Sequence, residues 1–288
     1  MKILAILVLY NCKISESKTI ASLLKGYSYN SQVFDFFKLI IYDNGLNDQK
    51  VSLTVNFKNE YVHQPENAGV AVAYNFALKE AIAQQYDWIL LLDQDSNLPE
   101  NFITNLFTTC SDIKRNNKVV AIIPKIFYRG HFFSPSKVLY GGVHRPIDYN
   151  HRGICNFQVT TIASGVLLRT SFIQEIGGFN ELYWLDWLDM WIFNSIHASG
   201  SKVYVTDSII EHELSILNLD KFMNENRYRN ILKYEAIFMR SHKSKYENYI
   251  YFLRLARRSL SLLFAATNKN YSIITLRHLI SLVFHTNA

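Results

Sequence analysis

The sequence predicts an α/β fold, with a mainly parallel mixed sheet flanked by helices and a helical extension at the carboxyl end. Over residues 1–125, short apolar runs alternate with segments of helical length, which is the pattern of strand–helix–strand units. Beyond residue 220 the alternation ends, and long segments with helical spacing follow. A chain of 288 residues that is 49% hydrophobic can bury the core that such a fold requires.

The individual elements follow from these patterns in chain order. Strands are expected where short apolar runs are bounded by turn residues, and helices where apolar residues recur every three or four positions. Residues 127–156 are rich in Gly, His, Pro and aromatic residues, which predicts a long loop or hairpin excursion. The expected strands are 3–10, 37–42, 51–55, 61–63, 88–92, 119–124, 159–168 and 202–205, and the expected helices are 15–27, 67–85, 99–110, 170–176, 187–199, 221–240 and 246–264.

The chain is expected to contain one large domain, 1–220, and a basic extension, 221–288. The formal net charge is +6, and basic residues outnumber acidic ones most clearly after residue 220. A basic tail suggests an anionic partner surface, either phospholipid or nucleic acid, with solubility or a charged substrate as the plainer explanation. The basic residues of this extension are Lys221, Arg227, Arg229, Lys233, Arg240, Lys243, Lys245, Arg254, Arg257, Arg258, Lys269 and Arg277.

The helix 246–264 is expected to be basic and amphipathic, because arginines lie beside or opposite one apolar face. Tyr251 and Leu255 lie off that face, so the pattern is imperfect. The alternative is a helix packed on the domain or on a second subunit. The residues predicted to share the apolar face are Tyr249, Phe252, Leu253, Ala256, Leu260 and Leu263.

The cysteines and the amino-terminal segment bear on location. Cys12, Cys110 and Cys155 are an odd number without metal-like spacing, which favours a reduced, cytoplasmic protein without a disulfide framework. The apolar start lacks a small-residue cleavage site, so a buried first strand is expected rather than a signal peptide. No apolar run reaches the ~18 residues of a spanning helix. Any membrane contact is therefore expected to be peripheral.

The segment Trp88-Ile-Leu-Leu-Leu-Asp93-Gln94-Asp95-Ser96 carries the strongest chemical signal. A predicted strand ends directly in two carboxylates, and carboxylates are costly to bury without partners. Oxygen ligands at this place suit a hard divalent cation that also holds phosphates. The alternative is a loop with two solvated aspartates, because a D-x-D pattern is short and common.

Other acidic and imidazole residues also fall at the ends of expected elements. In open α/β sheets the ligand site lies beyond the carboxyl ends of the strands, so Asp43 and Asp93 are expected to share one crevice. Taken singly, each residue has a plainer explanation. Asp43 suits a turn, Asp186 and Asp189 suit a helix amino terminus, and a lone histidine such as His212 is more often structural.

Several motifs between Ile3 and Met239 occur in the order typical of a known family. The chain resembles the inverting family 2 glycosyltransferases of the GT-A fold, and within them the bacterial rhamnosyltransferase-like branch. The motifs are Val8-Leu-Tyr-Asn11, Ile41-Tyr-Asp43-Asn44, Glu66-Asn67-Ala-Gly69-Val-Ala-Val-Ala-Tyr-Asn75, Leu92-Asp93-Gln94-Asp95-Ser96, Ala163-Ser164-Gly165-Val-Leu-Leu-Arg169 with Ile176-Gly177-Gly178-Phe179, Trp184-Leu-Asp186-Trp-Leu-Asp189, Glu211-His212 and Arg227-Tyr228-Arg229-Asn230.

The resemblance implies that the two halves of the large domain bind different substrates. Residues up to about 125 would bind the nucleotide-sugar donor and residues 126–220 the acceptor. Mg²⁺ or Mn²⁺ would be bound by Asp95 and His212, with Asp93 contacting the ribose, or the metal through water. Asp189 would be the general base, with Asp186 as the fallback. The donor side would also include Tyr10, Asp43 and Asn67, and the acceptor side Ser164, Gly165, Trp184 and Trp187.

The sequence departs from the family pattern in the helix that carries Asp189, and it leaves more than one donor possible. The family often has an acid two positions after the base and an Arg later in that helix, where this chain has Trp191 and Asn194. The spelling Asp93-Gln94-Asp95 favours dTDP-L-rhamnose as donor, with UDP-galactofuranose or a UDP-hexose as alternatives. The acceptor would be a saccharide, commonly lipid-linked, in O-antigen or polysaccharide assembly at the inner membrane face, and the carboxyl-terminal helices would also allow a homodimer.

Two functions of other classes remain as alternatives. One is a non-catalytic module that binds sugar nucleotides or carbohydrate. The other is a nucleic-acid-binding protein, which is disfavoured because the chain has no recognised nucleic-acid motif and its acidic site residues would repel phosphate.

Overall fold

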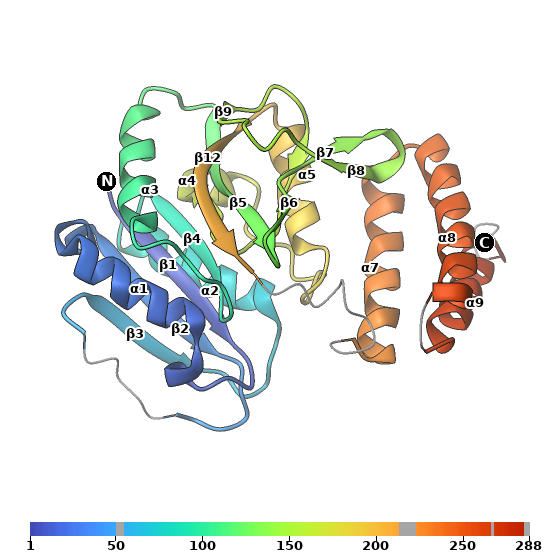
Figure 1. The fold of residues 1–288 in the computed structure, drawn as a ribbon, viewed down its shortest axis with the longest axis horizontal. Helices are drawn as coiled ribbons and strands as arrows, with labels where there is room; N and C mark the ends of the chain where they lie inside the picture. Colours follow the sequence, from blue (N-terminus) through green and yellow to red (C-terminus); the bar gives the residue numbers. More distant parts are fainter. Residues whose placement is uncertain (50–54, 213–222, 266–267, 285–288) are drawn as a thin grey trace. The chain divides into compact units, whose positions relative to one another are not determined.

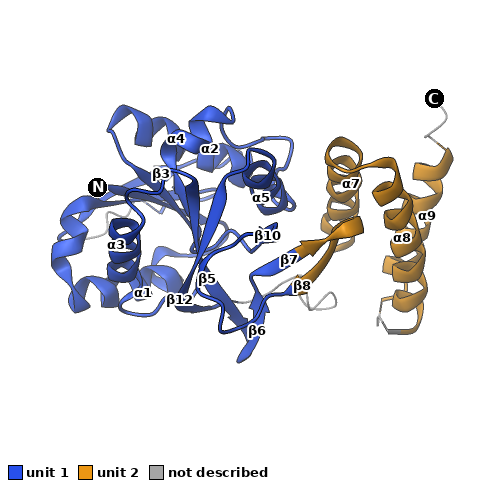
Figure 2. Cartoon of the chain, turned by 90° about the horizontal axis from the view of Figure 1, so that it is seen from above, with its two compact units in different colours: residues 1–137, 146–213 blue, residues 138–145, 214–288 orange. Residues whose placement is uncertain are grey.

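A computed structural model of the chain describes residues 1–49, 55–212, 223–265 and 268–284. Most of the expected strand 51–55 and the first two residues of the expected helix 221–240 lie outside the described residues. The chain divides into two compact units, which Figure 2 colours separately. The first comprises Met1–Lys137 and Pro146–Glu213, and the second comprises Val138–Arg145 and Leu214–Ala288.

The first unit is built on a mixed sheet, which confirms the predicted fold class (Figure 1). Among the described residues this sheet has nine strands in the order β3-β2-β1-β4-β11-β5-β12-β9, with β6 paired to β5. β1 pairs in parallel with β2 and β4, and β12 pairs in parallel with β5. The strands are β1 Ile3–Leu9, β2 Phe37–Asp43, β3 Lys58–His63, β4 Trp88–Asp93, β5 Val119–Tyr128, β6 His131–Ser134, β9 Gly153–Ile154, β11 Leu167–Arg169 and β12 Lys202–Glu211.

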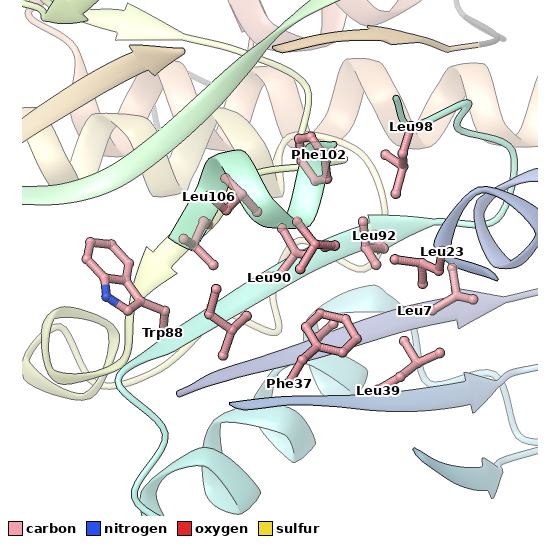
Figure 3. Packing of buried hydrophobic residues seen from close by; sticks show 14 of the residues in the cluster. Leu7, Leu23, Phe37, Leu39, Trp88, Leu90, Leu92, Leu98, Phe102 and Leu106 are labelled. Atoms are coloured by element: carbon pink, nitrogen blue, oxygen red, sulfur yellow. The ribbon is translucent and has the colours of Figure 1, made fainter. Parts of the chain in front are cut away.

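Helices cover both faces of this sheet because its central strands are apolar on both sides. Side chains of β1, β2 and β4 pack on one face against α1 and α3 (Figure 3), where Leu23 and Leu106 join the core. On the other face, Tyr42 of β2 contacts Phe76 of α2, with ring centroids 5.6 Å apart. The helices of this unit are η1 Ile14–Glu16, α1 Lys18–Tyr29, η2 Ser31–Phe36, α2 Val70–Ala83, α3 Phe102–Asp112, α4 Thr170–Glu175 and α5 Leu188–Ala198.

The expected strand 159–168 is two strands, so that prediction was wrong. β10 (Val159–Thr160) pairs with β7 (Ser136–Leu139), whereas β11 lies antiparallel between β4 and β5. Gly165, with φ of +80°, lies in the segment between β10 and β11 and adopts a backbone that other residues rarely take. The excursion over 127–156 contains β6, β7, η3 (Tyr140–Gly142), β8 (Val143–Pro146) and β9.

The second unit contains η3 and, in its described part, three α-helices, α7 Glu225–His242, α8 Lys245–Ala265 and α9 Asn270–Phe284. Glu235 of α7 is 2% exposed and accepts two hydrogen bonds from Arg258 of α8, over 2.7 and 3.0 Å. Arg254 of α8 donates to the carbonyls of Gly141 and Gly142, each over 2.8 Å. Two of the three arginines predicted to lie beside or opposite the apolar face of α8 therefore bind inside this unit.

The face of α8 that is apolar in sequence is the exposed one. Tyr249 is 63% and Leu260 61% exposed, whereas Tyr251 and Leu255, which lie off that face, are buried. Helix α9, which was not predicted, shows the same arrangement. Each helix thus has a buried side and, opposite it, a row of exposed apolar side chains, which we call its apolar stripe. The stripe of α8 consists of Tyr246, Tyr249, Leu253, Leu260, Leu263 and Phe264, and the stripe of α9 consists of Ile273, Leu276, Ile280, Val283 and Phe284. Within the described ranges, no helix combines the length and the apolar character needed to cross a membrane.

Candidate active site

The carboxyl ends of β1, β2 and β4 bring two of the predicted residues to one edge of the sheet. Leu9 of β1 is in register with Asp43 of β2, and Val8 of β1 with Asp93 of β4. Asp43 and Asp93 therefore flank the end of the same central strand. Neighbouring strands lie about 4.8 Å apart, so residues on the two outer strands are separated by roughly 10 Å.

The turn after Asp93 is held by the amino-terminal end of α1. Ser17 donates its hydroxyl to the carbonyl of Gln94 over 2.8 Å, and Thr19 donates its hydroxyl to the carbonyl of Asp93. The N–H of Ser96 in turn donates to the Thr19 hydroxyl over 3.1 Å. These bonds fix the backbone that carries both carboxylates, so the turn is an ordered structure rather than a loose solvated loop.

Gln94 has a structural role between the two aspartates. Its side-chain oxygen accepts a hydrogen bond from the N–H of Tyr10 over 2.9 Å. Tyr10 directly follows β1, and its side chain is 51% exposed. Gln94 therefore ties the end of β1 to the Asp93–Asp95 turn, and it leaves the Tyr10 ring at the surface of this edge.

His212, one residue beyond β12, lies against the Asp93–Asp95 turn. Its Nδ1 is 3.4 Å from Oδ1 of Asp95, and its Nε2 is 3.7 Å from Oδ2 of Asp93. The histidine is 9% exposed, so it reaches the two carboxylates from inside the fold. The structure thus brings together the three side chains that the sequence suggested as a metal site.

The three side chains fit a divalent cation in part. Ligand atoms about 2.1 Å from an ion and at right angles to each other lie about 3 Å apart, so the separation of Asp95 and Nδ1 suits two ligands. Asp93 faces the opposite ring nitrogen and cannot join the same ion directly. Accordingly, among the described residues no three His, Cys, Asp or Glu side chains converge well enough to hold a metal ion. The donor set fits a sparse site completed by water and phosphate.

Burial and like charge act on Asp93. Burial raises the pKa of the Asp93 carboxyl above its ordinary value, the charge of Asp95 raises it further, and His212 lowers it. A positive charge placed between the two aspartates would relieve this repulsion. The electrostatics at the turn therefore favour a bound cation.

Asp189 lies at the start of α5 and within electrostatic reach of Asp93. The helix follows Trp187, whose φ of +73° turns the chain sharply into α5. Oδ1 of Asp189 accepts a hydrogen bond from the N–H of Met190 over 2.7 Å. Burial, with the charges of Asp186 and Asp93, raises the pKa of Asp189 to about 6, although the Met190 N–H lowers it.

Tyr74 is a residue of this site that the sequence did not single out. Burial raises the pKa of its hydroxyl well above the ordinary value, and the charges of Asp93 and Asp189 raise it further. The ring therefore lies near both aspartates while belonging to α2. The sequence did contain a signal, because Tyr74 lies in the motif Glu66–Asn75, but that motif gave no reason to prefer Tyr74 over its neighbours.

Helix α2 also holds the segment that leads to Asp189. The N–H of Val70 donates to the carbonyl of Trp184 over 2.8 Å, and the Trp184 ring N–H donates to the carbonyl of Asn67 over 3.0 Å. Asn75 binds the backbone of Phe179 at both its N–H and its carbonyl, over 2.8 and 2.9 Å. Asn67 and Trp184, predicted on the donor and acceptor sides, are thus in direct contact.

Asp43 is buried, 1% exposed, in a hydrogen-bonded network of its own. One carboxylate oxygen accepts from the N–H of Gly45, and the other accepts from Gln49 and from the Tyr61 hydroxyl, each over 2.8 Å. Burial raises the pKa of Tyr61 to about 12, which keeps its hydroxyl a donor to this carboxylate. Gln49 and Tyr61 were not expected here, because nothing in their spacing links them to Asp43.

Ser164 and Gly165, predicted on the acceptor side, lie beneath the Asp93–Asp95 turn. Ser164 is completely buried and accepts a hydrogen bond from the N–H of Asp93 over 3.1 Å. A side chain at Gly165 would meet Ile210 and Pro124.

The other residues predicted near the acceptor lie closer to the surface. Trp187 and Asp186 are half-buried, and Trp184 is 36% exposed.

Comparison with known proteins places the fold and the family. A search of curated proteins found no match. Crystal structures of TarS from S. aureus are similar: the structure of TarS 1-349 in complex with UDP-GlcNAc has a TM-score of 0.57 at 14% identity, covering 93% of this chain and 74% of that one. The complex of TarS 1-349 with UDP has a TM-score of 0.54 at 13% identity, with the same coverage.

The longer TarS structure gives a TM-score of 0.53 at 14% identity and covers 93% of this chain, which in turn spans 45% of that protein. At these identities the likeness establishes the GT-A fold. The sequence profile described as "Glycosyl transferase family 2" matches residues 5–172, which is more than half of the chain. The chain belongs to glycosyl transferase family 2.

Proposed function

We propose that this chain transfers a sugar from a nucleotide-sugar donor to an acceptor hydroxyl with inversion at the anomeric carbon, as a metal-dependent hexosyltransferase. The observation that carries the proposal is the cluster of Asp93, Asp95 and His212 at the carboxyl edge of the sheet, with Asp189 in electrostatic reach. Such an edge is where α/β sheets bind nucleotides. Family membership and the GT-A fold support the same reaction.

The donor would bind at the ends of β1, β2 and β4. Mg²⁺ or Mn²⁺ bound by Asp95 and His212 would neutralise the charge that develops on the departing diphosphate. Asp93 would contact the ribose, or the ion through water. Beside Asp43, the side-chain oxygen of Asn44 is buried and has no hydrogen-bond partner among the described residues, which supports a polar ligand at the end of β2. Tyr10 and Asn67 would complete the donor side.

Asp189 would act as the general base. With a pKa raised to about 6, its carboxylate is ionised at neutral pH and is a stronger base than an ordinary aspartate. It would take the proton from the acceptor hydroxyl as that oxygen attacks the anomeric carbon opposite the diphosphate. Asp186, three residues earlier in the chain, is the fallback. Trp184 and Trp187 would stack on the acceptor sugar.

The donor sugar is proposed to be L-rhamnose from dTDP-L-rhamnose, on the sequence Asp93-Gln94-Asp95. Gln94 also has a structural role through Tyr10, so its presence alone does not require this donor. UDP-galactofuranose or a UDP-hexose is the alternative, which the UDP-GlcNAc bound to the structurally similar TarS supports.

The acceptor is proposed to be a lipid-linked saccharide of O-antigen or polysaccharide assembly at the cytoplasmic membrane face. The apolar stripes of α8 and α9 support a peripheral contact with an anionic bilayer. Exposed Lys245, Arg257, Lys269 and Arg277 accompany these stripes, α9 contains no acidic residue, and α8 contains only Glu247. This excess of positive charge favours anionic lipid over a second copy of the same face.

A donor screen tests the reaction. Purified protein is incubated with lipid-linked saccharide acceptors and dTDP-L-rhamnose, UDP-galactofuranose, UDP-galactose, UDP-glucose or UDP-GlcNAc, and the released nucleotide is measured. Turnover is expected with one donor, to disappear with EDTA and to return with Mg²⁺ or Mn²⁺. Turnover that persists in EDTA would contradict the roles of Asp95 and His212, and turnover with a UDP-sugar alone would replace rhamnose.

A further inference from the structure

Two buried serines connect the backbone of Asp93 to the ring of His212. Ser96 and Ser164 are both 0% exposed, and their hydroxyl oxygens lie 2.7 Å apart. The N–H of Asp93 donates to Ser164 over 3.1 Å, and the Ser96 oxygen lies 3.0 Å from Nδ1 of His212. Ser164 was predicted on the acceptor side, but neither serine takes part in the proposed transfer step, and both contact residues that do.

The available hydrogens decide the direction of this chain of hydrogen bonds. The N–H of Asp93 can only donate, so the Ser164 oxygen accepts it. In the described part of the protein, the acceptor shown for the Ser164 hydroxyl hydrogen is the Ser96 oxygen. Ser96 then keeps its own hydrogen for Nδ1 of His212. The opposite direction would leave the Ser164 hydrogen buried without an acceptor, which is unfavourable.

This direction determines which tautomer of His212 is present. A hydroxyl that donates to Nδ1 requires a lone pair on that nitrogen, so the neutral ring carries its proton on Nε2. Nδ1 is also the nitrogen that faces Asp95, whereas Nε2 faces Asp93. Metal-binding histidines commonly direct the other ring N–H at a carboxylate, and Asp93 is placed to serve as that carboxylate.

We propose that Ser96 and Ser164 are positioning residues, which hold His212 in the tautomer and orientation whose Nδ1 lone pair faces Asp95. The inference deepens the proposed function, on which it rests, because it assigns Nδ1 as the nitrogen that would bind the cation beside Asp95. A bound cation would replace the Ser96 hydrogen as the partner of Nδ1. The two aspartates then differ in role, since Asp95 binds the ion and Asp93 orients the histidine.

The tautomer of the unaltered, metal-free protein is the first test. ¹⁵N-labelled protein in alkaline buffer is examined by ¹H–¹⁵N spectra of the imidazole rings, and the His212 signals are assigned by their loss in His212→Gln. The proton is expected on Nε2. A proton on Nδ1 would overturn the proposal whether or not the protein transfers sugar, whereas failure of every donor with the proton on Nε2 would reject only the proposed function.

Ser96→Ala and Ser164→Ala provide the second test, with the His212 ring signals of the metal-free protein as the readout. Ser96→Ala is expected to shift the proton toward Nδ1, because that nitrogen then faces only the Asp95 carboxylate, and Ser164→Ala is expected to give a mixture of tautomers, because Ser96 can then donate to Nδ1 or accept from it. Unchanged His212 signals in both variants would overturn the proposal. If Ser164→Ala does not fold, Ser96→Ala and the spectrum of the unaltered protein still decide.

Ser134→Ala is the matched control. Ser134 is buried, and its hydroxyl lies 2.7 Å from that of Thr161, so the variant removes a hydroxyl pair of the same length. It is expected to lose thermal stability to a similar degree while keeping unaltered His212 signals. An equal change of the His212 signals in Ser134→Ala would show a general structural effect and contradict a positioning role.

Discussion

At the residue scale, Asp189 combines a basic carboxylate with a place at the start of a helix. We expect Asp189→Asn to lower kcat by about 100-fold or more, because an amide cannot accept the proton of the acceptor hydroxyl, with little change in the KM for the donor. Steady-state kinetics at saturating cation check this. Asp186→Asn is the comparison, and a larger loss of kcat in that variant would transfer the role of base to Asp186.

The raised pKa of Asp189 also predicts a pH profile. The base must be ionised, so kcat/KM is expected to rise with pH through about 6 and to level off above it. Because burial makes the charged form of Asp189 unfavourable, Asp189→Asn is expected to be more stable than the unaltered protein above the pKa and to lose that advantage as the pH falls. Kinetics and thermal unfolding at several pH values check both trends, and a profile that falls as the pH rises through this range would contradict the assignment.

At the element scale, the amino terminus of α2 and the Trp184 segment fit too closely to admit a side chain at position 69. Gly69 has φ of +99°, and a Cβ there would lie 2.5 Å from Cδ1 of Trp184 and closer still to its carbonyl oxygen. We expect Gly69→Ala to destabilise the protein by at least about 2 kcal/mol and to reduce transfer, because Trp184 precedes the Asp189 helix.

Gly177→Ala is the matched control for that substitution. Gly177 has φ of +85°, but nothing lies within 4 Å of a Cβ placed there. The loss of stability in Gly177→Ala therefore measures the backbone strain alone. Denaturant unfolding and donor kinetics measure both variants. Equal effects in the two variants would show that the contact with Trp184 adds nothing.

The α7–α8 pair depends on a buried ion pair. The Glu235 side chain is 3% exposed, and that of Arg258 is 31% exposed. We expect Glu235→Gln to cost roughly 3 kcal/mol, because it leaves the Arg258 charge without its partner. The double variant Glu235→Leu with Arg258→Met is expected to be more stable than either single substitution, and chemical unfolding of the set measures this. Additive losses in the double variant would show that the two side chains are not coupled.

At the scale of the whole molecule, the apolar stripes predict binding to a lipid surface. We expect the double variant Leu253→Ser with Leu260→Ser to lose at least about half of its sedimentation with anionic liposomes, since each buried leucine contributes about 1.5–3 kcal/mol. Leu46→Ser is the control, because Leu46 is 78% exposed in the other unit. Equal partition of both variants and the unaltered protein would remove the membrane proposal.

Much of the first unit could be predicted because its signals are local. The strand that precedes Asp93 and the helix that contains Tyr74 are readable from nearby residues, and parallel pairing then brings Asp43 and Asp93 to one edge. The contact between Ser96 and His212 joins residues 116 positions apart, and no local pattern encodes it. The same holds for Gln49, whose contact with Asp43 depends on a loop conformation.

The sequence could not predict which face of α8 is buried. Its periodicity identified an apolar face, but apolar residues lie on both sides of the helix, and only packing shows that Leu255 is buried while Leu260 is exposed. The sequence by itself determined the alternating α/β architecture, the family and the acidic motifs, because these depend on neighbouring residues. The tertiary structure alone decided which side chains share the site, how His212 is held and which face of α8 meets solvent, because these depend on hydrogen bonds and packing between residues that are distant in the chain.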